Sequence, residues 1–96
     1  MAGWILTSTD PDVVLRLPVG ATKTVGRTPQ ADFILDAALV SRVHCRLATD
    51  AKDQLTVVDL GSTNGTQVNG ELCDRSVLKS GDVLTIGRVN FTVAPA

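Results

Sequence analysis

The sequence predicts an all-β fold, a sandwich or barrel of short strands. Apolar and polar residues alternate over short runs, turn-forming residues separate nearly every pair of runs, and no segment keeps a helical period over the length of a helix. With 96 residues, of which 44% are hydrophobic, the chain is expected to form one domain around one small core.

The first half of the chain contains four strand-like runs. Residues 13–17 alternate between apolar and polar, residues 22–25 are largely β-branched, and residues 33–35 form a short apolar run. Residues 43–47 alternate again, and this pattern places Cys45 in the core.

The second half contains four more runs, and turn residues separate them. The runs are residues 54–60, 66–68, 83–86 and 91–93. Turn chemistry falls between the runs throughout the chain, at Pro11, 18–20, Pro29, 51–53, Asn69-Gly70 and 80–82.

The balance of basic and acidic residues argues against some classes of binding surface. Nine basic and ten acidic residues give a net charge of −1, which argues against a general nucleic-acid or membrane surface. No apolar run is long enough for a membrane span or a signal peptide. The chain is therefore expected to be intracellular and soluble, with its two cysteines reduced rather than paired.

Three polar segments follow strand-like runs and carry similar chemistry. They are Gly26-Arg27, residues 41–44 and residues 62–66. Together they supply a guanidinium, hydroxyls, an amide and flexible backbone, which are the groups that receive an oxyanion. From spacing alone, Arg27 could equally be a solvated surface charge.

Two Asn-Gly pairs are candidate hairpin turns, because a type I′ turn needs positive φ at both central residues. For Asn69-Gly70 a plain turn is the preferred interpretation. Asn64-Gly65 is flanked by Ser62, Thr63 and Thr66, and this density of hydroxyls favours a ligand-binding loop.

Ser41 and His44 are the candidates for nucleophilic catalysis. Ser41 lies in no Gly-x-Ser-x-Gly elbow, and residues three apart on an extended backbone point to opposite faces. We therefore expect His44 to be structural and to hydrogen-bond loop backbone. One histidine and two distant cysteines match no zinc spacing, and residues 61–66 lack the ending of a nucleotide-binding loop. No catalytic residue, metal or cofactor is expected.

The ordered segments resemble a known family. Gly26-Arg27, then residues 41–44, 62–66 and 68–70 resemble the signature of forkhead-associated (FHA) domains, as do residues 78–82 before a late strand. The resemblance covers essentially the whole chain. It implies an antiparallel β-sandwich of about eleven short strands, with loops at one end that bind phosphothreonine peptides in signalling.

The resemblance also assigns ligand contacts. Arg27 matches the arginine that contacts phosphate, Ser41 the serine that donates to a phosphate oxygen, and Arg42 the neighbouring polar or basic contact. Thr63 matches a residue that touches the phosphate, and Asn64 the asparagine that holds the peptide main chain.

Other positions match residues that shape the loops, namely Gly26, His44, Gly65 and Asn69. Leu39 lies two residues before Ser41, where some members carry an arginine that selects an acidic residue three after the phosphothreonine. A leucine there argues against acidic selection.

The resemblance suggests a context as well. A domain near the start of its chain, with a tryptophan close by, is similar to nibrin-type repair scaffolds, and this similarity points to DNA-damage signalling and the cell cycle. The location that the resemblance implies is nuclear or cytoplasmic, with the nucleus slightly favoured. The domain is expected to be monomeric and to belong to a larger protein. The alternatives are an FHA-fold interaction or dimerisation module that uses a phosphate-independent surface and, last, a small hydrolase. The presence of Arg27, Ser41 and Asn64 argues against the first alternative.

Overall fold

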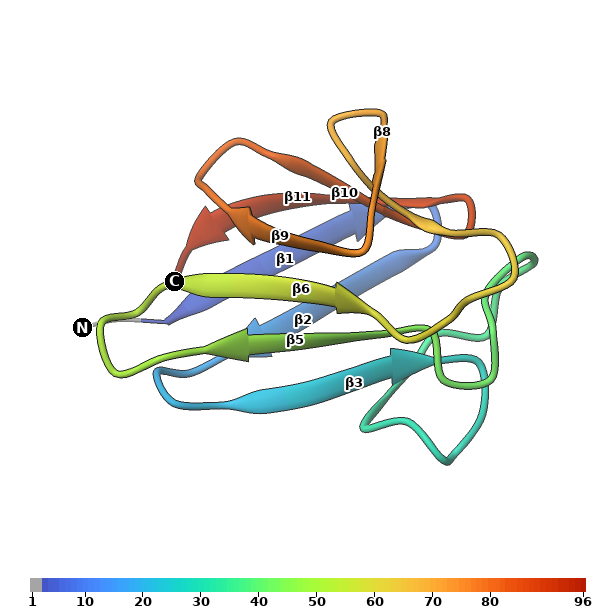
Figure 1. Ribbon diagram of the computed structural model, residues 1–96, viewed down its shortest axis with the longest axis horizontal. Helices are drawn as coiled ribbons and strands as arrows, with labels where there is room; N and C mark the ends of the chain where they lie inside the picture. Colours follow the sequence, from blue (N-terminus) through green and yellow to red (C-terminus); the bar gives the residue numbers. More distant parts are fainter. Residues whose placement is uncertain (1–2) are drawn as a thin grey trace.

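The computed structural model describes residues 3–96, which form two β-sheets packed face to face (Figure 1). The strands are β1 (Trp4–Thr9), β2 (Asp12–Leu17), β3 (Thr22–Gly26), β4 (Phe33–Ile34), β5 (Cys45–Thr49), β6 (Leu55–Asp59), β7 (Thr66–Val68), β8 (Glu71–Cys73), β9 (Arg75–Leu78), β10 (Val83–Ile86) and β11 (Val89–Pro95). The all-β sandwich and its strand number are as predicted.

One sheet has six strands in the order β2-β1-β11-β10-β7-β8, and the other has five in the order β4-β3-β5-β6-β9. Neighbouring strands are antiparallel, with one exception, because β4 runs parallel to β3. Because β4 pairs in parallel with β3, the connection between them must return along the sheet before β4 begins. The sandwich is antiparallel as predicted, apart from this one parallel pair.

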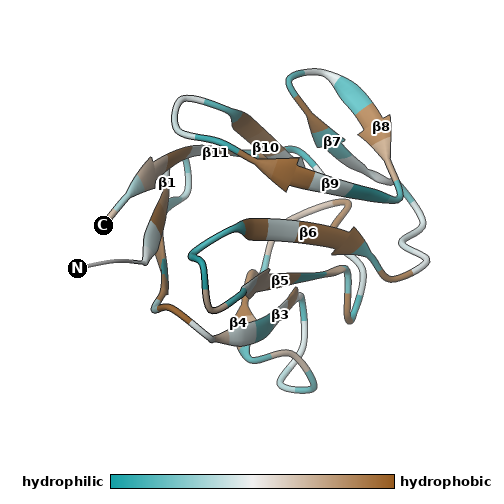
Figure 2. Ribbon diagram, turned by 60° about the vertical axis from the view of Figure 1, so that its left-hand side comes forward, coloured by the Kyte–Doolittle hydropathy of each residue, from teal (hydrophilic) through white to brown (hydrophobic). Residues whose placement is uncertain are grey.

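The core lies between the sheets, where every second side chain of each strand points inward. Val89, Phe91 and Val93 of β11 are buried, and so are Cys45 and Leu47 of β5. Full burial of each large apolar side chain contributes about 1.5–3 kcal/mol. Figure 2 shows the hydrophobic colour mainly on the strands and the hydrophilic colour mainly on the loops.

Three strands, β1, β8 and β9, were not predicted as strands. In β1 the inward positions are Leu6 and Ser8, so a buried serine interrupts the apolar alternation. β8 and β9 are short, and each exposes an apolar side chain, Leu72 and Val77. In addition, β5 starts at Cys45 and not at Val43. Cys45 is completely buried, as expected.

The connections β3–β4, β4–β5 and β6–β7 gather at one end of the sandwich (Figure 1). The expected polar segments lie on these connections. Within residues 3–96, no helix is long and apolar enough to cross a membrane.

Candidate functional site

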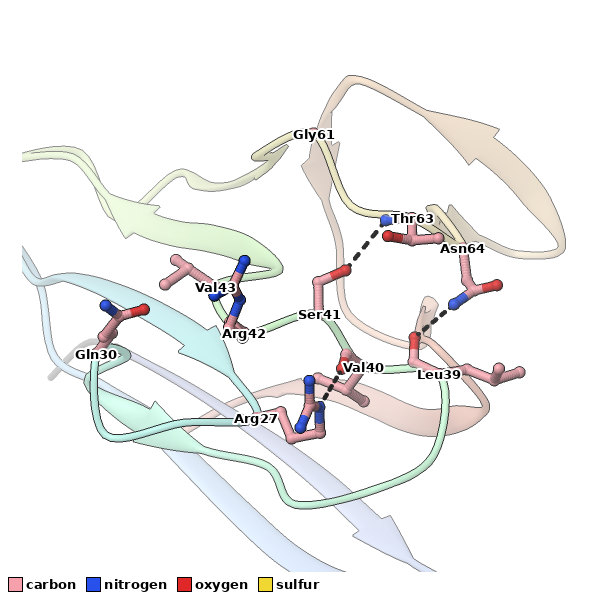
Figure 3. Close-up of a pocket in the computed structure, with 10 residues that line it drawn as sticks. All are labelled: Arg27, Gln30, Leu39, Val40, Ser41, Arg42, Val43, Gly61, Thr63 and Asn64. Atoms are coloured by element: carbon pink, nitrogen blue, oxygen red, sulfur yellow. Dashed lines mark hydrogen bonds between the residues drawn. The ribbon is translucent and has the colours of Figure 1, made fainter.

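A hollow of about 780 Å³, here called the first hollow, opens between the loops at this end (Figure 3). Its lining includes Arg27 and Arg42, and none of the lining residues in the described part of the chain is acidic. The predicted contacts that line it are Arg27, Leu39, Ser41, Arg42, Thr63 and Asn64. Val43 and Gly61, which belong to segments considered in the sequence, also line it, as do Gln30 and Val40, which lie outside those segments.

Arg27 follows the end of β3 and is tied to the β4–β5 loop. Its amide donates to Ser41 O at 2.9 Å, and its Nε donates to Val40 O at 3.0 Å. The side chain is exposed, and its terminal nitrogens make no hydrogen bond to residues 3–96. The Nε–H bond to Val40 thus fixes the guanidinium in place, and its two terminal nitrogens remain available to hydrogen-bond an anion.

Gly26 permits this approach of two backbone segments. A Cβ at this position would lie 2.1 Å from Arg42 O, which is backbone and cannot move aside cheaply. Thr28 bonds the same carbonyl, through its amide at 3.4 Å and its hydroxyl at 3.3 Å. Gly26 thus places Arg27 beside the segment that carries Ser41 and Arg42.

His44 is completely buried and joins two loops. Its Nδ1 accepts the amide of Ser41 at 3.0 Å. This assigns the proton to Nε2, which donates to Gly65 O at 2.9 Å. The expectation of a structural histidine that hydrogen-bonds loop backbone is confirmed.

The geometric reason for separating Ser41 from His44 was wrong, because residues 40–44 bend and are not extended. The ring does reach back to Ser41, but it meets the amide and not the hydroxyl. Ser41 Oγ instead accepts the amide of Thr63 at 3.0 Å. The hydroxyl proton remains available to a ligand, and both imidazole nitrogens are already engaged.

The loop after β6 is organised by Asp59, a residue that the sequence analysis missed in this role. Its Oδ2 accepts the amides of Gly61 at 3.1 Å and Ser62 at 3.0 Å. Its Oδ1 accepts the hydroxyls of Ser62 at 2.6 Å and Thr66 at 2.7 Å. An aspartate two residues before Gly61-Ser62 is the available sequence signal, since aspartate side chains commonly bond the backbone two residues onward.

Burial works to raise the pKa of Asp59, but the hydrogen bonds from Ser62 and Thr66 and the nearby His44 lower it below the ordinary 3.8. Asp59 therefore stays ionised while it fixes the loop. Ser62 Oγ in turn accepts the amide of Gly65 at 2.9 Å. Thr63 and Asn64 stand at the exposed crest of this braced loop.

Asn64 and Leu39 connect the two loops across the first hollow. Asn64 Nδ2 donates to Leu39 O at 3.2 Å. Leu39 has φ of 68°, an unusual conformation for leucine, and its side chain is exposed. Gly65 has positive φ and Asn64 does not, so this pair forms no type I′ turn.

Asn69 and Gly70 both have positive φ, as the plain hairpin interpretation predicts. Asn69 Oδ1 accepts the amide of Val83 at 2.9 Å, and Nδ2 donates to Asp82 at 3.1 Å. Asn69 therefore shapes the β7–β8 turn and is not among the residues of the first hollow. Gly26, His44 and Gly65, by contrast, support the loops around it.

Residues 23–87 match the family described as the FHA domain. Over 77 residues the chain is 43% identical to the oxoglutarate dehydrogenase inhibitor of Corynebacterium efficiens, and the match covers 78% of this chain and 54% of that protein. It is also 43% identical over 77 residues to the glycogen accumulation regulator GarA of Mycobacterium tuberculosis, covering 78% and 47% respectively. The chain spans about half the length of these relatives.

Solved structures share the fold over almost the whole chain. The FHA domain of the CT664 protein from Chlamydia trachomatis has a TM-score of 0.88 at 28% identity, with 96% of both chains covered. A structure from work on phosphothreonine-dependent FHA domain interactions has a TM-score of 0.86 at 31% identity, with 96% and 95% covered.

These relatives correct the expected context. The named proteins are a bacterial enzyme inhibitor and a bacterial regulator of glycogen accumulation. The similarity to nibrin-type repair scaffolds is therefore not supported, and neither are DNA-damage signalling, the cell cycle or a nuclear location.

Proposed function

Because the chain belongs to the FHA domain family and is thus a phosphothreonine-peptide binding module of signalling, we propose that the first hollow is its phosphate site. The observation that carries this proposal is the pairing of Arg27 and Arg42 with the hydroxyl of Ser41 around a hollow whose described lining is free of carboxylates.

Each residue has a role in the proposal. Arg27 grips two phosphate oxygens with its outer nitrogens, Arg42 adds a second positive charge, and Ser41 donates its hydroxyl proton. The amide of Thr63 exchanges its bond to Ser41 Oγ for a phosphate oxygen. Asn64 holds the peptide main chain.

The free energy expected for binding a phosphothreonine peptide suits a reversible signalling interaction. A phosphothreonine carries about −1.5 to −2 charges. Each hydrogen bond to a charged group contributes about 1.5–3 kcal/mol, and part of the total offsets the freedom lost by the peptide. The expected affinity is on the order of micromolar, near −8 kcal/mol.

The relatives suggest the setting of this module. It would act, without catalysis of its own, as a monomeric module of a longer bacterial regulatory protein that recruits a phosphorylated protein partner, with no direct nucleic-acid ligand. This rests on the names of the inhibitor and regulator relatives, on the engaged nitrogens of His44 and on the net charge of −1. Leu39 would favour a non-acidic residue at the third position after the phosphothreonine.

A peptide titration tests the proposal. A degenerate phosphothreonine library is matched with phosphoserine and unphosphorylated versions, and binding is followed by fluorescence anisotropy. Phosphothreonine should bind at least about tenfold tighter than phosphoserine, because the buried methyl contributes about 0.8 kcal/mol and the stiffer side chain loses less freedom. Binding independent of phosphate would instead favour a phosphate-independent interaction surface.

Arg27→Ala should weaken phosphothreonine binding by about tenfold or more, because a charged bond of about 1.5–3 kcal/mol is lost. The matched control is Arg16→Ala, which removes an exposed arginine from β2 in the other sheet. Both variants should keep the wild-type circular dichroism spectrum. Equal binding by a folded Arg27→Ala variant and by the control would remove Arg27 from the site.

A further inference from the structure

A second hollow, of about 460 Å³, lies on the other side of the Thr63–Asn64 crest. Thr63 and Asn64 line both hollows, so these two residues form the wall between them. The far side of the second hollow is formed by Leu72 and Cys73 of β8 and by Asp74, which connects β8 to β9. Figures 1 and 2 show the β7–β8 hairpin projecting from the sandwich at this place.

The two hollows carry opposite charge. The first is lined by Arg27 and Arg42, whereas the second is lined by Asp59 and Asp74, and its lining residues within 3–96 include no basic one. Asp74 is exposed, and among residues 3–96 its one hydrogen bond is made by its backbone carbonyl, which accepts the amide of Asp59 at 2.8 Å. Its carboxylate is therefore accessible to a cation.

Leu72 adds an apolar surface to the second hollow. Its side chain is 70% exposed, the highest value among the large hydrophobic residues described as exposed. It lies over Gly65, since a Cβ on Gly65 would come 2.5 Å from Leu72 Cδ2. An exposed leucine beside an aspartate suits a side chain with an apolar stem and a positive end.

We infer that the second hollow receives a basic residue, arginine or lysine, that flanks the phosphothreonine in the same peptide. The inference rests on the proposed function of the first hollow. The phosphate occupies the positive hollow, the main chain crosses the Thr63–Asn64 crest, and the basic side chain lays its stem on Leu72 with its charge beside Asp74. The preferred peptide thus carries a negative phosphate for the first hollow and a positive side chain for the second.

The separation of the hollows limits where the basic residue can lie. Consecutive Cα atoms are 3.8 Å apart and an extended peptide advances about 3.3 Å per residue, so crossing a wall two residues wide takes roughly two to four peptide residues. The ion pair between Asp74 and the basic residue of the peptide is partly exposed to water, so added salt should weaken it.

The first test uses the wild-type domain and alanine-flanked phosphothreonine peptides. Each position on both sides of the phosphothreonine is set in turn to arginine, glutamine or glutamate, with an unphosphorylated copy of every peptide. One position, two to four residues away on one side, should bind arginine about two- to fivefold tighter than glutamine, the range of an exposed ion pair. Glutamate should be the weakest there, and added salt should reduce the difference.

The second test reverses the charge of the hollow. In Asp74→Lys the same peptide position should prefer glutamate over arginine, while in the control Asp12→Lys on β2 the preference for arginine should persist. Leu72→Ala should reduce the arginine preference, and Val14→Ala, an exposed apolar residue on β2, should not.

The outcomes separate the two proposals. Phosphate-dependent binding without an arginine preference at any position, or with a preference unchanged in Asp74→Lys, overturns this inference and leaves the proposed function standing. Equal binding of phosphorylated and unphosphorylated peptides overturns both.

Discussion

At the scale of the residue, the imidazole of His44 braces both walls of the first hollow. It accepts the amide of Ser41 and donates to the carbonyl of Gly65, and it is completely buried. Because each partner is a backbone group, the loss of the ring would leave a donor and an acceptor without their partner.

His44→Ala should lower the free energy of unfolding by about 3 kcal/mol or more, because a buried group without a partner costs about 1–3 kcal/mol and a cavity is added. Thermal melts would measure this. Arg46→Ala, an exposed neighbour on β5, is the control and should change stability by less than about 0.5 kcal/mol. Unchanged melting with lost peptide binding would instead make His44 a ligand contact.

The sequence allowed Arg27, Ser41 and Asn64 to be placed at one site, because their side-chain chemistry and order are visible in it. Asp59 was missed, because its four hydrogen bonds exist only once the following loop has folded around it. The positive φ of Leu39 was missed for a similar reason, since leucine gives no local signal for that conformation.

At the scale of the element, the end of β3 must touch the backbone of the β4–β5 loop. Gly26→Ala should therefore destabilise the domain by several kcal/mol, since its Cβ would lie 2.1 Å from Arg42 O. Gly20→Ala is the control, because a Cβ there meets no atom within 4 Å and only the positive φ is penalised, by about 1–2 kcal/mol. If urea unfolding showed the same loss of stability in Gly26→Ala and Gly20→Ala, the close approach of Gly26 to Arg42 O would not be what limits residue 26 to glycine.

The loop after β6 should respond to acid through Asp59. Its pKa is lowered in the folded state, so its contribution to stability is present above the unfolded value of 3.8 and is lost as pH falls through the folded pKa. The free energy of unfolding, measured in urea from pH 6 to pH 2, should therefore fall below about pH 4.

In Asp59→Asn the acid-induced loss should be smaller, because the titrating group is gone, whereas Asp12→Asn on β2 serves as the charge-matched control. If the free energy of unfolding fell equally steeply with decreasing pH below pH 4 in wild type and in Asp59→Asn, the Asp59 carboxylate would not stabilise the loop.

Elements with clean alternation or β-branched runs, such as β2, β3 and β10, were predicted close to their observed bounds. The short strands β8 and β9 were not, because they form by pairing with β7 and β6 and carry little pattern of their own. The parallel β3–β4 pair likewise depends on the path of the intervening loop, which local pattern does not encode.

At the scale of the whole molecule, Cys45 reports on the integrity of the sandwich. Burial, together with Asp59 and Cys73, raises the pKa of its thiol to about 12. Cys73 is only partly buried, and both thiols are free. Iodoacetamide at neutral pH should therefore modify Cys73 first and Cys45 only when the domain opens.

Mass spectrometry of the labelled Cys73→Ser variant would give the rate at Cys45 alone. This rate should rise with urea in parallel with the unfolded fraction. Labelling of Cys45 at the rate of Cys73 in native buffer would contradict a sealed core between the two sheets.

NMR on the wild-type domain can map where the loops at one end of the sandwich bind phosphothreonine. During titration with a phosphothreonine peptide, the amide resonances of Arg27, Ser41, Thr63 and Asn64 should shift together, and the unphosphorylated peptide should leave them in place. Shifts confined to the outer faces of the two sheets, or identical shifts with and without phosphate, would contradict a phosphate site in the first hollow.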